Sequence, residues 1–533
     1  MADPDRLILA NIIADGVERT PDLDVLTFVT VTRGSDFSDE IRTYQDLWNN
    51  GQRMAQGLIE AGMAEGEAFA IIMQNHPEFV DLMVASSIAN SIFVPIDPRT
   101  RGEKLKYMLT FTGCRGVVIA DYAAPALAQV IGDVKGLDWV WVLETGEGDV
   151  SGLGEFKSLR EILARPVPNI APRATDPAHP MQMLFTSGTT GDPKAILAPY
   201  ARFGAISSLG PALGLRPDDR PYTGLSLTHA NAQIITLGNI LKMGLRGVIG
   251  RRFTKSRLWD ITRHYGCTVF NLLGGMINAI YSEPVKPDDA DNPVRYVLSA
   301  GMPAAIWEDF ARRFDVEIYE FYGCAEGGLT LNPPGAGPVG SIGKPPPGLI
   351  CKIFDEDDNE VAPGEKGQIC FKNADGSDIE VVYFKNPEAS AEKTRGGWFR
   401  SGDIGHKDED GWVYFDYRAG SGIRRNGDFV NIPFVEKAIA EEETVDDVFV
   451  YGVHTPDNAP GEKEIVAAIV PTDPDSFDAA ALFDYCRRVL EANFVPSFLH
   501  IVDKIPKTAS EKPQERFLLE DFERGGAGIV RIS

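Results

Sequence analysis

Short apolar runs alternate with helical segments along residues 68–143, and this alternation limits the fold more than any other feature of the chain. Each apolar run has the length of a strand, and the segments between them space their apolar residues as helices do. The predicted strands are 68–73, 92–96, 116–120 and 139–143, and the predicted helices are 77–89, 103–111 and 123–131. Because parallel strands are joined by right-handed helical crossovers, this part predicts a mainly parallel α/β sheet with helices on both faces.

The remaining chain predicts more α/β structure and one smaller antiparallel unit. A segment rich in Gly, Pro and Asp, 145–180, separates the first sheet from an apolar strand at 181–185, and residues 251–284 predict a helix, a strand and a helix. Strands at 349–353 and 368–372 are bounded by Gly/Pro turns, which favours an antiparallel subdomain. Strands at 448–453, 464–470 and 499–502, with an amphipathic helix among them, predict a final small α/β unit.

The strand at 181–185 leads into a loop of hydroxyls and glycines closed by a lysine, Thr186–Lys194. Glycines let the backbone approach an anion and direct successive N–H groups at it, and the hydroxyls and the lysine add donors and charge. The loop therefore predicts a polyphosphate ligand, although Ser/Thr/Gly clusters are also ordinary loops. It is not the common P-loop, because only two residues separate Gly188 from Gly191 and Asp-Pro precedes the lysine.

Length and charge exclude several classes of protein. A chain of 533 residues exceeds one ordinary core, so at least two domains are expected. Its net charge of -25 disfavours nucleic acid and membrane partners, although a local positive pocket for ATP or CoA is still allowed.

The six cysteines show no Cys-x-x-Cys spacing, which fits reduced thiols, and no metal cluster is encoded. The N-terminus lacks a basic region leading into an apolar core, and no eighteen apolar residues run uninterrupted, so a cytoplasmic, unanchored protein is expected.

Four more motifs follow the loop in chain order. They are Ser299–Pro303 (SAGMP), Tyr319–Glu326 (YEFYGCAE), Trp398–Gly405 (WFRSGDIG) and Ile505–Lys512 (IPKTASEK). With the loop TSGTTGDPK, they resemble the signature motifs of the acyl-adenylate-forming superfamily of acyl-CoA synthetases, adenylation domains and luciferases, from about residue 40 to the end. The resemblance implies a large domain, residues 1–419, of stacked, mainly parallel α/β sheets plus a small antiparallel subdomain. It also implies a small mobile α/β C-terminal domain, residues 420–533.

The resemblance also implies how the chain holds MgATP. Tyr322 would stack on the adenine through its face, Glu320 is a candidate partner for the adenine amino group, and Asp403 would accept the ribose hydroxyls. A carboxylate four residues after the tyrosine suits magnesium that bridges phosphate oxygens. The implied nucleotide-binding residues are Thr186, Ser187, Gly188, Thr189, Thr190, Gly191, Lys194, Ala300, Gly301, Glu320, Phe321, Tyr322, Gly323, Asp403 and Arg418, and the implied magnesium ligands are Glu326 and Thr186.

Catalysis and acyl transfer are assigned in the same way. Lys512, Glu326 and His229 are the implied catalytic residues, and His229 would also line the junction of acyl pocket and CoA tunnel. Gly274 and Gly275 match a pocket-lining segment that would equally serve as core packing. Gly420 and Ser421 mark the hinge, about which the C-terminal domain would rotate to present Arg424 and Gly427 to CoA.

The chain departs from the family's pattern at three places. Ala325 replaces the usual threonine, Gly420-Ser421 replaces a lysine and an acidic residue, and Glu511 and Pro513 flank the lysine in place of Gly and Ile.

The sequence as a whole predicts an AMP-forming acid:CoA ligase that uses ATP, Mg²⁺ and coenzyme A. Amino-acid-activating relatives carry an aspartate where this chain has His229, so a plain carboxylic acid is favoured, with aromatic, branched, carnitine-like and steroid side-chain acids all open. An adenylating enzyme that passes its acyl group to a carrier protein or another acceptor, a noncatalytic descendant and a homodimer also stay open. An unrelated P-loop NTPase is disfavoured by the spacing of the loop.

Overall fold

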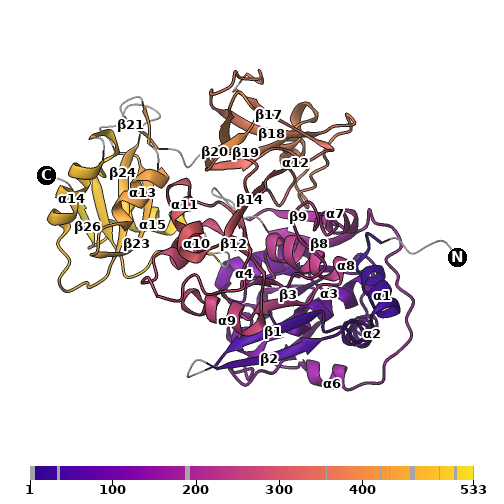
Figure 1. Cartoon of the computed structure of the whole chain (residues 1–533). Coiled ribbons are helices and arrows are strands. Elements are labelled where there is room, and N and C mark those ends of the chain that lie inside the picture. Colours follow the sequence, from indigo (N-terminus) through magenta and orange to yellow (C-terminus); the bar gives the residue numbers. More distant parts are fainter. Residues whose placement is uncertain are drawn as a thin grey trace.

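The computed structural model describes residues 6–32, 36–185, 193–355, 357–418, 423–425, 428–430, 432–455, 463–490, 492–508 and 513–531. Figure 1 shows a large body formed by the first two thirds of the chain, a smaller antiparallel unit above it and the C-terminal unit to one side. The predicted fold class is confirmed, because two parallel-rich sheets, an antiparallel sheet and a small C-terminal α/β unit are all present.

A seven-stranded sheet carries the predicted alternation, in the order β7-β6-β5-β3-β4-β8-β9. Its strands are β3 (Ala68–Ile72), β4 (Ile92–Pro95), β5 (Gly116–Ala120), β6 (Trp139–Leu143), β7 (Lys157–Ser158), β8 (Pro180–Phe185) and β9 (Ala195–Pro199). Its helices include α3 (Pro77–Ala89), α4 (Gly102–Thr112), α5 (Ala124–Ala128) and α6 (Leu159–Leu163). All neighbours are parallel except β8 and β9. The expected separation of the strand at 181–185 from this sheet is wrong, because β8 pairs with β4 through Gln182 and Phe93.

An eight-stranded sheet forms the second layer, in the order β15-β14-β13-β12-β10-β11-β1-β2. Its strands are β1 (Leu26–Val31), β2 (Phe37–Arg42), β10 (Pro221–Thr223), β11 (Gly247–Gly250), β12 (Val269–Leu273), β13 (Tyr296–Ala300), β14 (Glu317–Gly323) and β15 (Leu329–Asn332). The helices of this region are α7 (Tyr200–Ile206), a π-helix (Asn231–Gly238), α8 (Asn239–Met243), α9 (Leu258–Tyr265), α10 (Gly274–Tyr281) and α11 (Trp307–Phe314). The sheet is parallel except at its two edge strands.

One hydrophobic core joins the two sheets and takes in α1 (Leu9–Arg19), α2 (Tyr44–Glu60) and α3. Helix α2 begins with a capping box between Thr43 and Asp46, and α3 is buried at every position. A helix that is buried on all sides needs a surrounding core. The two carboxylates of α3 are compensated in this core by Arg42, which contacts Asp81 at 3.1 Å and Glu78 at 3.4 Å.

The antiparallel subdomain is a five-stranded sheet in the order β16-β20-β19-β18-β17. Its strands are β16 (Ser341–Gly343), β17 (Leu349–Phe354), β18 (Gly367–Asn373), β19 (Phe399–Lys407) and β20 (Val413–Arg418), with helix α12 (Pro387–Lys393). Residues 382–384 of the same subdomain pair with β9, because Leu197 N–H donates to the Val382 carbonyl and Phe384 N–H to the Ala195 carbonyl. This pairing ties the subdomain to the strand that follows the predicted phosphate loop.

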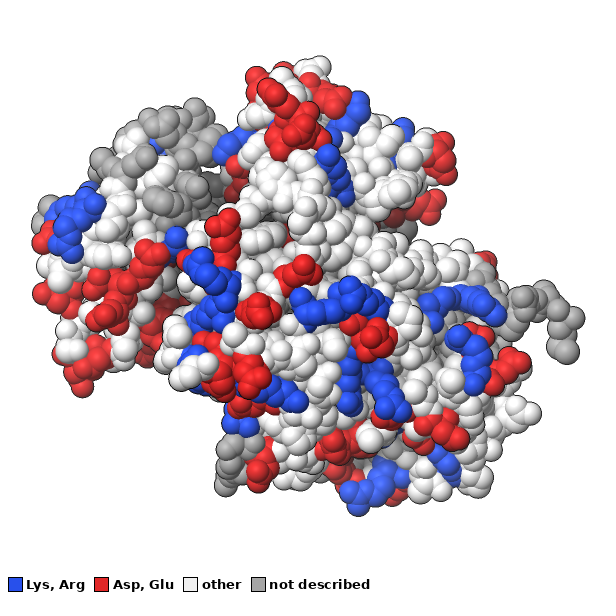
Figure 2. Space-filling model, viewed as in Figure 1, with Lys and Arg blue, Asp and Glu red and all other residues white. Residues whose placement is uncertain are grey.

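The C-terminal unit has its own core, built from Ile423 onward around a four-stranded sheet, β23-β24-β25-β26. Its elements are β21 (Arg424–Arg425), β22 (Asp428–Phe429), α13 (Ile432–Ala440), β23 (Val445–Val453), β24 (Glu464–Pro471), α14 (Ala479–Val489), β25 (Phe498–Ile501), α15 (Glu515–Glu523) and β26 (Ile529–Arg531). Among the described residues no helix combines the length and apolarity needed to cross a bilayer. In the face seen in Figure 2, acidic side chains cover the top of the antiparallel subdomain and much of the lower C-terminal unit.

Candidate active site

The two ends of the predicted phosphate loop are placed by the antiparallel pair β8 and β9. Thr186, Ser187, Gly188, Thr189, Thr190 and Gly191 lie outside the described residues. Lys194, which directly precedes β9, places its Nζ 5.4 Å from the ring centroid of Tyr383. The described end of the loop therefore faces the antiparallel subdomain.

Glu326 lies on a tight turn between β14 and β15. Reciprocal backbone bonds of 3.2 Å between Cys324 and Gly327 close the turn. The Glu326 side chain is buried, and its Oε1 accepts a hydrogen bond of 2.8 Å from the Tyr383 hydroxyl. Within the described residues no hydrogen bond engages Oε2. A carboxylate with one oxygen held and one available suits a hard cation.

Asp403 connects the large body to the subdomain. It is buried and lies opposite Arg418 in the β19–β20 register, with 3.7 Å between its Oδ1 and the Arg418 guanidinium. The hydroxyl of Tyr322, at the end of β14, donates to Asp403 Oδ2 at 2.6 Å. Burial raises the pKa of Tyr322, and the Asp403 charge adds to this, so the hydroxyl stays a donor. The structure thus brings together three residues that the sequence analysis assigned to one nucleoside.

The Tyr322 ring lies nearly parallel to the ring of Phe371, with centroids 6.2 Å apart. The Cys324 thiol lies 3.1 Å from the Tyr322 hydroxyl, and burial raises the pKa of this thiol to about 12. A thiol with a raised pKa is neutral, so Cys324 adds no charge beside the Tyr322 hydroxyl.

Ala300, Gly301 and Gly274 meet where β13 and β12 end. A Cβ on Gly274 would lie 2.5 Å from the Gly301 carbonyl oxygen, and Gly301 itself has a φ of 101°. Both positions therefore require glycine. The Glu320 carboxylate holds this turn, because it accepts the Gly301 N–H at 2.5 Å and the Met302 N–H at 3.1 Å.

Those two bonds occupy both oxygens of Glu320, whose side chain is 2% exposed. Burial raises the pKa of this carboxyl to about 7. The structure gives Glu320 the Gly301 turn as a partner, and its predicted contact with the adenine amino group stays a prediction. Phe321 is buried beside it, whereas Gly323 at the end of β14 is exposed.

His229 is half-buried two residues before the π-helix begins, and its Nδ1 accepts the Asn231 N–H at 3.2 Å. Asn231 is in turn bonded by the amide of Asn271 on β12, so the histidine lies near the strand that leads into Gly274. Gly275, in the first turn of α10, is exposed. Lys512, Gly420, Ser421 and Gly427 lie outside the described residues, and Arg424 is described only as part of β21.

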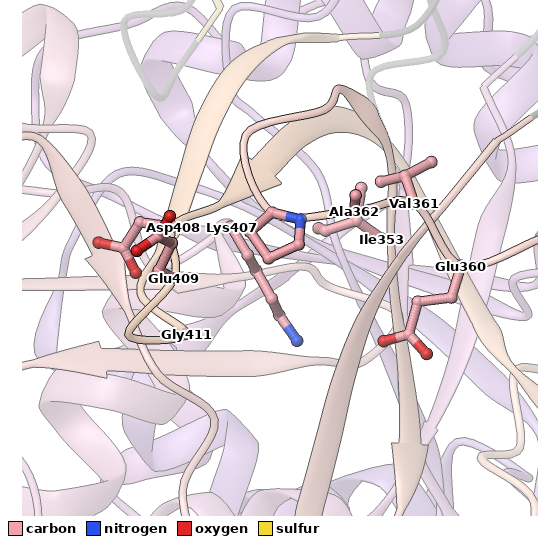
Figure 3. Close-up of a pocket in the computed structure, with 9 residues that line it drawn as sticks. Ile353, Glu360, Val361, Ala362, Lys407, Asp408, Glu409 and Gly411 are labelled. Carbon is pink, nitrogen blue, oxygen red and sulfur yellow. The ribbon is translucent and has the colours of Figure 1, made fainter.

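A hollow of about 230 Å³ lies elsewhere, in the antiparallel subdomain (Figure 3). The residues that line it are Ile353, Glu360, Val361, Ala362, Pro363, Lys407, Asp408, Glu409 and Gly411. None of them is a predicted site residue, and the Lys407 ammonium is bonded to the Cys351 carbonyl. This hollow is not part of the candidate site.

Two side chains of the site were missed by sequence reasoning, Tyr383 and Arg202. Tyr383 contacts Glu326, and Arg202 donates to the Cys324 carbonyl at 3.1 Å. Neither residue lies in one of the quoted motifs. Tyr383 is 57 residues from Glu326 in the sequence, and Arg202 is 122 residues from Cys324. Only the fold brings them to the turn.

The chain matches two family models. Residues 13–376 match the AMP-binding enzyme model, and residues 435–512 match the model of the AMP-binding enzyme C-terminal domain. The chain belongs to the AMP-binding enzyme family. The predicted superfamily is confirmed.

Relatives of this AMP-binding enzyme are named as CoA ligases. The medium/long-chain-fatty-acid–CoA ligase FadD17 of Mycobacterium marinum is 27% identical over 92% of this chain and 93% of its own length. The steroid-22-oyl-CoA synthetase of Rhodococcus jostii is 29% identical over 90% and 88%. The crystal structure of the anthranilate CoA ligase AuaEII with anthranoyl-AMP superposes with a TM-score of 0.82 at 21% identity, covering 97% of each chain. These relatives confirm the predictions of an AMP-forming CoA ligase and of ATP as its substrate, and they do not favour the carrier-protein and noncatalytic alternatives.

Proposed function

We propose that this site activates a plain carboxylic acid with MgATP and then passes the acyl group to the thiol of coenzyme A. In the first step the acid's carboxylate attacks the α-phosphorus, which forms the acyl-adenylate and releases pyrophosphate. In the second step the thiolate attacks the acyl carbon, AMP leaves, and the thiol proton goes to solvent. The observation that supports this most is the meeting of Glu326, Asp403 and the Lys194 end of the loop where the large body joins the subdomain.

The described residues fit magnesium delivered with the nucleotide. Among them no group of three or more His, Cys, Asp and Glu side chains is arranged to hold a metal by itself. Magnesium characteristically uses one or two protein carboxylates and completes its shell with substrate phosphates and water. Glu326, with Thr186 from the loop, would hold it, and it would bridge and neutralise phosphate oxygens.

The nucleoside would lie between the eight-stranded sheet and the antiparallel subdomain. Asp403 Oδ1 and Arg418 would take the ribose hydroxyls, while Tyr322 keeps Asp403 oriented through Oδ2. Ala300 and Gly301 would present a flat backbone surface to the base, and Glu320 would fix that surface. His229 would line the acyl side.

We also propose that residues 1–419 and 420–533 are the two domains and that the second rotates about Gly420 and Ser421 between the steps. The separate core that begins at Ile423 supports this boundary. Rotation would exchange Lys512 for Arg424 and Gly427 at the site.

We further propose a cytoplasmic protein without nucleic acid or membrane partners, because a net charge of -25 repels both kinds of anionic surface at long range. A homodimer is the assembly to test, by light scattering across a range of protein concentrations.

The test of the proposed function is a panel of carboxylic acids in acid-dependent pyrophosphate exchange and in CoA-dependent AMP release. One or more acids should support both assays. Lys512→Ala should lower exchange by roughly 10²- to 10³-fold, the size expected for losing one preorganised donor, and should spare thioester formation from a presynthesised acyl-AMP. Exchange at the parent rate in this variant would refute the lysine assignment.

A further inference from the structure

We propose that Tyr383 and Arg202 are positioning residues that direct the Glu326 carboxylate toward the nucleotide's metal. The inference rests on the proposed function, because Glu326 is assigned to magnesium there. It adds two residues of this chain to which the motifs assign no role.

Tyr383 fixes the carboxylate itself. Its hydroxyl donates to Glu326 Oε1 at 2.8 Å, and the two side chains are only 6% and 8% exposed. A carboxylate oxygen only accepts hydrogen bonds, so the Tyr383 hydroxyl is the donor in this contact. The bond selects one rotamer of Glu326 and leaves Oε2 to face a ligand.

The backbone of Tyr383 is tied to the strand that leaves the phosphate loop. Tyr383 forms a bridge with Ile196 on β9, and the bonds from Leu197 to Val382 and from Phe384 to Ala195 are both 2.8 Å. Ser390 Oγ also accepts the Tyr383 N–H at 2.9 Å. Any shift of β9 therefore moves the hydroxyl that holds Glu326.

Arg202 holds the backbone of the same turn. It lies on α7, which directly follows β9, and its Nη2 donates to the Cys324 carbonyl at 3.1 Å. Strand β9 and helix α7 thus hold the turn through two hydrogen bonds. Arg202 on α7 bonds the Cys324 carbonyl, and Tyr383, which pairs with β9, bonds the Glu326 side chain.

These contacts predict a metal-specific defect when the tyrosine hydroxyl is removed. Loss of an outer partner of a metal-binding carboxylate typically lowers metal affinity by about 10- to 100-fold. The test is Tyr383→Phe, with free Mn²⁺ measured by electron paramagnetic resonance in the presence of α,β-methylene-ATP. The half-saturating Mn²⁺ concentration should rise by about 10- to 100-fold, while the affinity for the analogue without metal should stay within about twofold of the parent value.

Tyr296→Phe is the matched control. Tyr296 is also a buried tyrosine with a hydroxyl bond, 2.7 Å to the Leu213 carbonyl, and it has no contact with the turn. Its Mn²⁺ affinity should equal that of the parent, even if its thermal unfolding temperature falls as in Tyr383→Phe. An equal loss of metal affinity in both variants would overturn the proposal, because it would reflect general loosening.

Glu326→Gln separates the two levels of inference. If this variant and Tyr383→Phe both weaken Mn²⁺ binding and the double variant is no weaker than Glu326→Gln, the tyrosine acts through the carboxylate. If Glu326→Gln weakens binding and Tyr383→Phe does not, the positioning role is refuted while the proposed function stands. If Glu326→Gln binds Mn²⁺ like the parent, the magnesium assignment fails, and the positioning role fails with it.

Arg202→Lys tests the hydrogen bond from Arg202 to the Cys324 carbonyl. A lysine keeps the charge but loses the planar guanidinium donor, so Mn²⁺ binding should weaken in the same direction as in Tyr383→Phe. Parental Mn²⁺ affinity in this variant would remove Arg202 from the proposal.

Discussion

The close backbone approach of Gly274 to Gly301 makes Gly274→Ala a sharp perturbation of the candidate site. An added Cβ would lie 2.5 Å from the Gly301 carbonyl oxygen, whereas ordinary contacts begin at 3.4 Å. The Gly301 turn would have to retreat by roughly 0.9 Å, and it is held in place by the Glu320 carboxylate. Forcing extra atoms into a packed region costs about 1–3 kcal/mol, of which the better helix propensity of alanine in α10 would offset up to about 1 kcal/mol.

The same displacement should weaken nucleotide binding, because Ala300 and Gly301 form the surface proposed for the base. A residual cost of about 1.4 kcal/mol corresponds to a tenfold change in an equilibrium constant. We expect urea denaturation to show a loss of about 1–2 kcal/mol in the free energy of unfolding. The KM for ATP in pyrophosphate exchange should rise about 5- to 10-fold.

Gly132→Ala is the control, because no heavy atom lies within 4 Å of a Cβ built at that glycine. Its stability and its KM for ATP should match those of the parent. If Gly274→Ala behaved like Gly132→Ala in both measurements, the close approach would not constrain the site and the assignment of this turn to the base would be wrong.

Three further predictions address stability, the α-phosphate and the hinge. Burial lowers the pKa of His76 to about 3, so only the unfolded chain gains this proton as pH falls below 6.5. The contribution of His76 to the free energy of unfolding is complete above pH 6.5 and declines by about 1.4 kcal/mol per pH unit below it. In urea denaturation, His76→Gln should therefore make the free energy of unfolding depend less on pH between pH 6.5 and 5.5. An unchanged pH dependence would contradict the assignment. Ala325→Thr should restore a donor worth roughly 0.5–1.5 kcal/mol and hold or raise the adenylation rate, whereas a large fall would mean that the turn has packed around alanine. Gly420→Pro, by fixing φ at roughly -65°, should abolish thioester formation from supplied acyl-AMP while pyrophosphate exchange continues. If both half-reactions survive, the hinge does not lie at Gly420.

The elements that sequence patterns predicted best are those encoded locally. Strands β3, β5 and β6 and helix α3 match their predicted ranges to within one residue, because strand length and apolar spacing are properties of a few neighbouring residues. The predicted helix at 123–131 is shorter, as α5 spans only Ala124–Ala128 between two short 3₁₀ segments. The partners of each strand were less accessible. The sequence placed β8 apart from the first sheet, although it pairs with β4 across nearly ninety residues.

The sequence by itself determined the family, the chemistry and the motif residues, because contiguous residues such as TSGTTGDPK and YEFYGCAE carry them. The tertiary structure alone decided how those residues are held. Tyr383 of the subdomain donates a hydrogen bond to Glu326, and Arg202 on α7 donates one to the Cys324 carbonyl. The same is true of Glu320, whose position in the motif gave no sign that its two oxygens accept the Gly301 and Met302 N–H groups. A hydrogen bond depends on the distance and direction between two groups, and for residues far apart in the chain only the packing of sheets and helices sets these.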